Sequence, residues 1–174
     1  NRSVMLVTPL RAMPVKVEKR KVLSKHLSLN EATRSRTATK NGISNQPNDT
    51  QLQSLIALAD NVFEPLREHV AGPIYVSSAF RSEGLNTRIG GSKTSQHCKG
   101  QAIDIDDTYG SATNAMMFQY IYENLDFDQL IWEYGDEKNP DWVHVSYVSE
   151  EENRNQTLKV SRATGKAVYS FWKK

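Results

Sequence analysis

The sequence is poor in cysteine and in long apolar runs. Its only cysteine is Cys98, so an internal disulfide scaffold is excluded. No apolar run approaches the roughly 18 residues that a membrane-spanning helix requires. Near the N-terminus, Pro9, Arg11 and Pro14 interrupt the apolar residues, which makes this stretch a poor signal peptide and leaves the export route open.

An excess of charge of one sign is also missing. The chain has 22 basic and 20 acidic residues, for a net charge of +2. This balance is too weak to predict nucleic-acid binding, although a mild positive charge is compatible with an anionic polymer such as the bacterial cell wall. A hydrophobic fraction of 38% with 24% charged residues is typical of an ordinary folded domain and excludes extensive disorder.

The chain divides into a short tail and one folded domain. Residues 1–23 contain three lysines and three arginines and lack a clean hydrophobic period, which predicts a basic N-terminal tail or leader. Residues 24–174 form the predicted domain. Within it, the sequence pattern predicts helices from 29, over about 50–71 and at 111–125, and a short helix or turn at 82–90. It predicts strands at 74–80, 101–106, 128–135 and 141–148, and a hairpin over 157–172. Because helices come first and strands later, we predict an α+β fold with a mostly antiparallel sheet and helices packed on one face.

Residues that favour helix starts mark the expected boundaries. Glu31 lies three residues after a serine, as in a capping box, and Pro65 should kink or restart the long helix. The expected N-caps of the three main helices are Ser28, Asp49 or Thr50, and Ser111.

Two of the four histidines lie in segments that can hold a metal. In "DWVHVSYV", strand alternation places His144 on the face opposite the valines, which should meet the core. In "QAIDID", the same alternation places Asp104 opposite the isoleucines. His97 is seven residues before Asp104, an odd number, but Gly100 can bend the chain and bring the imidazole back to the same side. His26 and His69 have no such spacing and are expected at the surface.

Two imidazoles and one carboxylate suffice to hold a catalytic zinc ion and leave a fourth coordination position open. Taken alone, His144 is more simply interpreted as a half-buried histidine that hydrogen-bonds to a neighbouring residue and binds no metal. Asp141, three residues before His144, is a candidate general base, although an aspartate after a proline is also common in turns.

These residues resemble a known family. The sequence "SQHCKGQAID" matches the pattern S-x-H-x-x-G-x-A-x-D of the zinc D-Ala-D-Ala carboxypeptidases, a family that also includes dipeptidases and phage L-alanyl-D-glutamate endopeptidases. "DWVH" resembles its second motif, and "SSAFRS" resembles the segment that carries its arginine, with Arg81 sixteen residues before His97. The resemblance covers about residues 24–174.

The resemblance implies a small α+β, hedgehog-like domain and Zn²⁺ as cofactor. It implies zinc ligands at His97, Asp104 and His144, Asp141 as general base, and Arg81 as the group that steadies a substrate carbonyl or carboxylate. Two departures are the aspartate at position 141, where some relatives have glutamate, and Phe80, where tyrosine is frequent.

Three further polar residues are candidates for substrate contact. Ser95 either binds substrate or braces the loop of His97. Gln129 and Glu133 share one face of a neighbouring strand, where exposed sheet residues are the simpler interpretation. The implied partner is the peptide stem of bacterial peptidoglycan, cut at the terminal D-alanine or, alternatively, inside the stem. No nucleic-acid partner and no membrane span are expected, and the protein is expected to be a monomer.

Two rival functions come from other classes. The same scaffold can keep zinc and lose catalysis, as the hedgehog signalling domains do, and would then be a binding module. A structural phage or envelope component that docks on peptidoglycan is the second rival. The presence of both Asp141 and Arg81 favours an enzyme.

Overall fold

The computed structural model describes residues 21–173. The predicted tail therefore lies almost wholly outside the described residues, although its last residues enter the fold, because β1 begins at Val22 and Leu23 is buried. In chain order the elements are β1 (Val22–Ser24), β2 (Leu27–Ser28), α1 (Leu29–Thr33), α2 (Arg36–Lys40), α3 (Asp49–Leu58), the π-helix η1 (Ala59–Phe63), α4 (Glu64–Val70), β3 (Tyr75–Ser78), α5 (Glu83–Arg88), the 3₁₀ helix η2 (Gln96–Lys99), β4 (Ala102–Asp106), α6 (Asn114–Asn124), β5 (Gln129–Glu133), β6 (Trp142–Ser146), β7 (Gln156–Ala163) and β8 (Lys166–Phe171).

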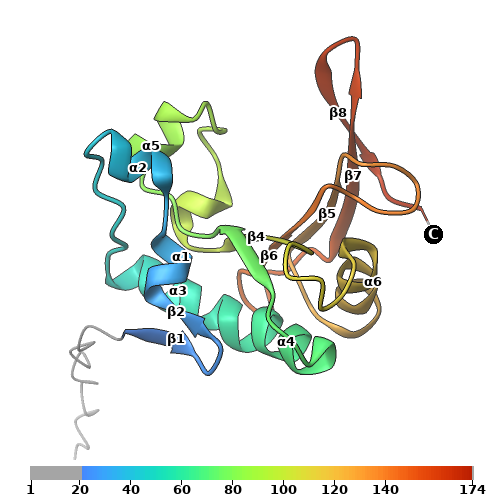
Figure 1. The fold of residues 1–174 in the computed structure, drawn as a ribbon, viewed down its shortest axis with the longest axis horizontal. Helices are drawn as coiled ribbons and strands as arrows, with labels where there is room; N and C mark the ends of the chain where they lie inside the picture. The colour runs from blue at the N-terminus through green and yellow to red at the C-terminus, as the bar shows by residue number, and fades with distance from the viewer. Residues whose placement is uncertain (1–20, 174) are drawn as a thin grey trace, which may run out of the picture.

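The central feature is a six-stranded sheet in the order β3-β4-β6-β5-β7-β8. Only β5 and β7 pair in parallel, and the other neighbours are antiparallel, so the predicted α+β fold with a mostly antiparallel sheet is confirmed. The β7–β8 hairpin extends away from the rest of the domain (Figure 1). No helix within residues 21–173 combines the length and apolar character needed to cross a bilayer.

The hydrophobic core lies between one face of this sheet and the helices. Strands β4, β5 and β6 each direct alternate apolar residues toward it, because side chains alternate between faces along a strand. The residues that meet α3, η1, α4 and α6 there are Ile103, Ile105, Leu130, Trp132, Val143 and Val145. The opposite face of the same strands is free to hold polar groups.

The long helix departs from regular α geometry where the sequence contains proline. Residues 59–63 form a π-helical segment immediately before Pro65, which lies at the start of α4. Proline has no N–H to donate, so the predicted restart at Pro65 takes the form of a wider turn. The N-cap is Asn48, in a capping box with Gln51, and not Asp49 or Thr50.

The other predicted caps have mixed outcomes. Ser28 and Glu31 form the expected capping box. Ser111 does not cap α6, because Thr113 does so through the Met116 amide. The Ser111 hydroxyl instead donates to the backbone carbonyl of Pro73, in the loop between α4 and β3.

A glycine sets the path of the chain from η2 into β4. Gly100 has φ +70°, and a Cβ added to it would collide with the Gln51 carbonyl oxygen of α3. Because this backbone conformation strains any L-residue and the space is filled by backbone, only glycine fits here. The predicted bend between His97 and Asp104 is confirmed.

Gly100→Ala is expected to lower the free energy of unfolding by roughly 2–5 kcal/mol, from backbone strain plus the displaced Gln51 carbonyl. Gly42 is a matched control, since it also has positive φ (+61°), but no atom lies within 4 Å of the position that a Cβ would occupy there. Gly42→Ala should cost only the strain, about 1–2 kcal/mol. Urea unfolding of both variants measures the difference, and equal losses would show that the contact with α3 is unimportant.

Candidate active site

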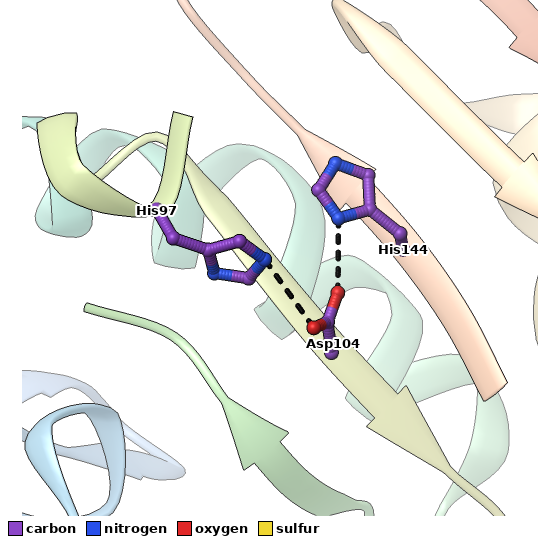
Figure 2. A group of neighbouring side chains, drawn as sticks. All are labelled: His97, Asp104 and His144. Carbon is purple, nitrogen blue, oxygen red and sulfur yellow. Dashed lines mark hydrogen bonds and ion pairs between the residues drawn. The ribbon is translucent and has the colours of Figure 1, made fainter. Parts of the chain in front are cut away.

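Three side chains converge on the polar face of the sheet. Figure 2 shows the Asp104 carboxylate between the rings of His97 and His144. One carboxylate oxygen lies 2.9 Å from His144 Nδ1, and the other lies 3.3 Å from His97 Nε2. One potential ligand atom from each residue lies within 4.8 Å of the other two.

Register and a single bend bring these residues together. Asp104 and His144 are directly paired across β4 and β6, so their side chains leave the same face side by side. His97 comes from η2, and its buried ring is oriented by the 2.7 Å contact of Nδ1 with the Ala79 carbonyl. Since a carbonyl only accepts, Nδ1 donates this bond, and Nε2 is the ring nitrogen that faces Asp104.

The electrostatics suit a cation. Burial alone would raise the pKa of the Asp104 carboxyl, but the two histidines outweigh burial and hold this pKa far below its usual range. Asp104 is therefore an anion at neutral pH.

The donor set fits zinc. Two imidazole nitrogens and one carboxylate oxygen are a known ligand set for this metal. The backbone carbonyl behind His97 supplies the outer hydrogen bond that metal-ligating histidines usually have. His97, Asp104 and His144 could therefore hold one zinc ion.

Arg81 lies beside the triad and is held in place by neighbours. Its Nε donates to the Ser78 hydroxyl at 3.0 Å and one terminal nitrogen donates to Asn86 Oδ1 at 3.2 Å. The other terminal nitrogen is 3.6 Å from Asp104. Its amide also donates to the His97 carbonyl, which ties the two segments together. A guanidinium fixed in this way can donate to an oxygen that develops negative charge.

A second brace supports the segment that carries His97. Gln96, next to that histidine, donates to the buried Asp128 carboxylate at 2.8 Å. Arg154 holds the same carboxylate with two side-chain bonds of 2.9 and 2.7 Å. Hydrogen bonds from Arg154 and Gln96 outweigh burial and lower the pKa of Asp128, so the brace is charged at neutral pH. This carboxylate thus links η2, β5 and the loop before β7.

The triad opens into a cavity of about 1050 Å³. Arg81 and three candidates for substrate contact from the sequence, Ser95, Gln129 and Glu133, line this cavity together with the three potential ligands. Gln129 is partly engaged, since its side chain donates to Gln156 at 2.8 Å. Among the described residues, the Ser95 side chain has no hydrogen-bond partner, so it does not brace the loop that carries His97.

Glu133 is buried, although the sequence suggested an exposed residue on the sheet. It is only 8% exposed, and it faces the cavity from the strand next to His144. Burial raises the pKa of Glu133 to about 7; His144 opposes this rise and Asp104 adds to it. A carboxyl group of this kind can take up and release a proton near neutral pH.

The structure does not bring Asp141 to the residues that line this cavity. Its amide continues the ladder with the Glu133 carbonyl at 2.9 Å, just before β6, and the residue is exposed. Asp141 lies in the bend before β6 begins at Trp142, so the strand alternation that orients His144 does not extend to it.

The sequence interpretation missed the contribution of the C-terminal hairpin. Its residues Leu158, Arg162 and Tyr169 line the cavity, as does Arg154 before it. Strand alternation within 157–172 could be recognised, but the placement of β7 beside β5 depends on long-range pairing that a local pattern does not reveal.

Comparison with known proteins gives one clear match. No curated protein matches the chain. The sequence model of the family described as Peptidase M15 matches residues 25–146, which is more than half of the chain and includes the three potential ligands, Arg81 and Glu133. With this match and the histidine–aspartate–histidine geometry together, the chain belongs to the peptidase M15 family.

Proposed function

We propose that this protein is a zinc-dependent peptidase that hydrolyses an amide bond in the peptide stem of bacterial peptidoglycan. The observation that carries the proposal is the convergence of His97, Asp104 and His144 with Arg81 and Glu133 in one cavity of an M15 chain. A zinc ion held by His97, Asp104 and His144 would supply Lewis-acid chemistry and would lower the pKa of a water molecule to about 7.

The chain's own groups supply the remaining chemistry. Glu133, buried and facing the cavity, accepts the proton of the attacking water and later returns it to the leaving amine. Arg81 donates to the carbonyl oxygen of the scissile bond as it becomes negative. Asp141, the base that the family resemblance implies, is the alternative to Glu133.

The position of the cut separates two versions of this function. A D-Ala-D-Ala carboxypeptidase is the first candidate from the sequence motifs. The cavity favours the second candidate, an L-alanyl-D-glutamate endopeptidase type, because its walls continue past the triad on both sides, to Gln96 and Arg154 in one direction and to Tyr134 and Arg162 in the other. A peptide that passes through such a cavity presents an internal bond.

The test is mass spectrometry of peptidoglycan fragments digested by the zinc-loaded protein. A carboxypeptidase releases free D-alanine and rejects stems whose C-terminus is blocked as an amide, whereas an endopeptidase cuts within the stem and tolerates the block. Intact fragments after prolonged incubation with zinc-loaded protein would remove the proposed activity and favour a binding module.

Arg81→Lys is expected to lower kcat by an amount equivalent to ~2–4 kcal/mol of barrier and to change KM little, because a flexible ammonium does not replace the fixed guanidinium donor to the developing oxyanion. Steady-state kinetics on a defined stem peptide measure both constants. A change confined to KM, reproduced in the wild type by amidating the substrate's C-terminus, would instead assign Arg81 to a terminal carboxylate.

A further inference from the structure

The C-terminal hairpin extends the face of the sheet that holds the candidate zinc ligands. Asp104 and His144 belong to a row of directly paired residues that crosses the sheet. The row continues with Ile131 in β5, Leu158 in β7 and Phe171 in β8. These side chains share one face, because directly paired residues in a sheet point the same way. The hairpin follows residue 146, where the family match ends, and yet it forms one wall of the active-site cavity.

The next row along the strands lies at the level of Glu133. Glu133 pairs with Val160 of β7, and Val160 pairs with Tyr169 of β8. Arg162, two residues after Val160, lies on the same face, and both Arg162 and Tyr169 line the cavity. The hairpin therefore places a cation and a phenol just beyond the proposed general base.

Arg162 is the cavity arginine without an acidic partner. Arg81 lies against Asp104 and Arg154 is paired with Asp128, but no carboxylate within residues 21–173 forms an ion pair with Arg162. Its guanidinium stacks over the Tyr134 ring at 4.6 Å from the centroid. Stacking orients the guanidinium plane and leaves its N–H edges free, which is the geometry that binds a carboxylate by two parallel bonds.

We propose that Arg162, with Tyr169 beside it, binds a side-chain carboxylate of an acidic peptide substrate, on the Glu133 side of the scissile bond. The proposal rests on the peptidase function above and adds the substrate class: a peptide with an internal carboxylate. Charge complementarity selects this occupant, because at that end of the cavity the guanidinium has no acidic partner among the described residues.

The test compares three short peptides of identical length. The first has one acidic side chain and an amidated C-terminus, the second has glutamine in place of the acid, and the third has glutamine with a free C-terminus. Affinities are measured by calorimetry on the zinc-loaded full chain carrying Glu133→Gln, which slows turnover. Arg162→Gln is then added. Lys166→Gln is the matched control, because it removes one positive charge from the same hairpin on the opposite face, since Lys166 pairs with Ala163.

We expect the acidic peptide to bind about five- to tenfold more tightly than its glutamine counterpart. Arg162→Gln should abolish this preference, and Lys166→Gln should leave it intact. Equal affinities before Arg162 is changed, a preference that survives Arg162→Gln, or an Arg162 effect confined to the peptide with a free C-terminus would each overturn the proposal.

Cleavage assays on the wild-type protein distinguish the role of Arg162 from the peptidase function. If zinc-loaded protein cuts the acidic and glutamine peptides equally well, the peptidase function stands and the role of Arg162 is wrong. If the acidic peptide binds through Arg162 but no peptide or cell-wall fragment is cut, the binding role stands and the peptidase function is wrong.

Discussion

Glu133→Gln is expected to reduce amide hydrolysis by at least about 10²-fold while zinc content stays at one ion per chain, because the variant keeps the ligands and loses the proton acceptor. The residue is buried, lines the cavity and lies on the strand next to His144. Glutamine preserves the shape and the hydrogen-bonding capacity but cannot take a proton. Turnover of a stem peptide, with zinc measured by mass spectrometry on the same samples, gives the result.

Asp141→Asn is the matched comparison, since it too replaces a carboxylate by an amide, and Asp141 lies three residues before the potential ligand His144. Its exposed position outside the cavity lining predicts near-normal turnover. If instead Asp141→Asn is the inactive variant and Glu133→Gln keeps its activity, the family-implied base is right and our assignment is wrong. Zinc loss in either variant would identify a ligand.

Glu133→Gln is also expected to change how the stability of the zinc-free protein depends on pH. The folded-state pKa of Glu133 is raised to about 7 from an ordinary value of 4.5. The folded state therefore holds this proton more tightly, so the contribution of Glu133 to the free energy of unfolding should fall as pH rises from about 4.5 to 7 and level off above that range. Glu133→Gln removes this loss, at most about 3 kcal/mol. Urea unfolding at pH 4.5 and pH 8 compares the two proteins, and a pH-independent difference would contradict a raised pKa.

Asp104→Asn is expected to abolish both zinc retention and hydrolysis. Asp104 is the anion between two histidines, and an amide both weakens the metal bond and removes the charge that balances the cation. The loss in activity should exceed the about 10–100-fold that is typical of changes in residues that only orient a ligand. Zinc analysis after dialysis and a hydrolysis assay measure the two effects.

Asp106→Asn is the control for this prediction, because Asp106 lies on the same strand and face two residues on, outside the cavity lining. It accepts hydrogen bonds from Thr108 and should keep both zinc and activity. Full zinc content and activity in Asp104→Asn would show that the metal binds elsewhere.

Local alternation was enough to predict much of this site. A strand has period two, so the valines around His144 and the isoleucines around Asp104 reveal which face each polar residue shares. The bend at Gly100 was predictable because glycine is the residue that tolerates it.

What escaped prediction depends on contacts between distant segments. Glu133 looked like an exposed sheet residue because its burial comes from the strands on either side, β6 and β7. Arg162 carried no local signal, since its relation to the site follows from the parallel pairing of β7 with β5. The N-cap of α3 was misplaced by only one residue, at Asp49 in place of Asn48. Asn48, Asp49 and Thr50 are all residue types that cap helices, so the sequence alone does not choose among them.

The unbroken pairing from β4 to β8 also limits how this enzyme can diversify. A slip of β7 by one residue along β5 would keep the hydrogen-bonded ladder but turn Arg162 to the opposite face and bring Ser161 toward the cavity. A slip by two residues would keep the faces and shift the cation by about 7 Å along the strand. Changes in the loop between β6 and β7 therefore offer a discrete set of cavity walls, in which the preferred substrate charge can invert while the candidate zinc ligands keep their positions.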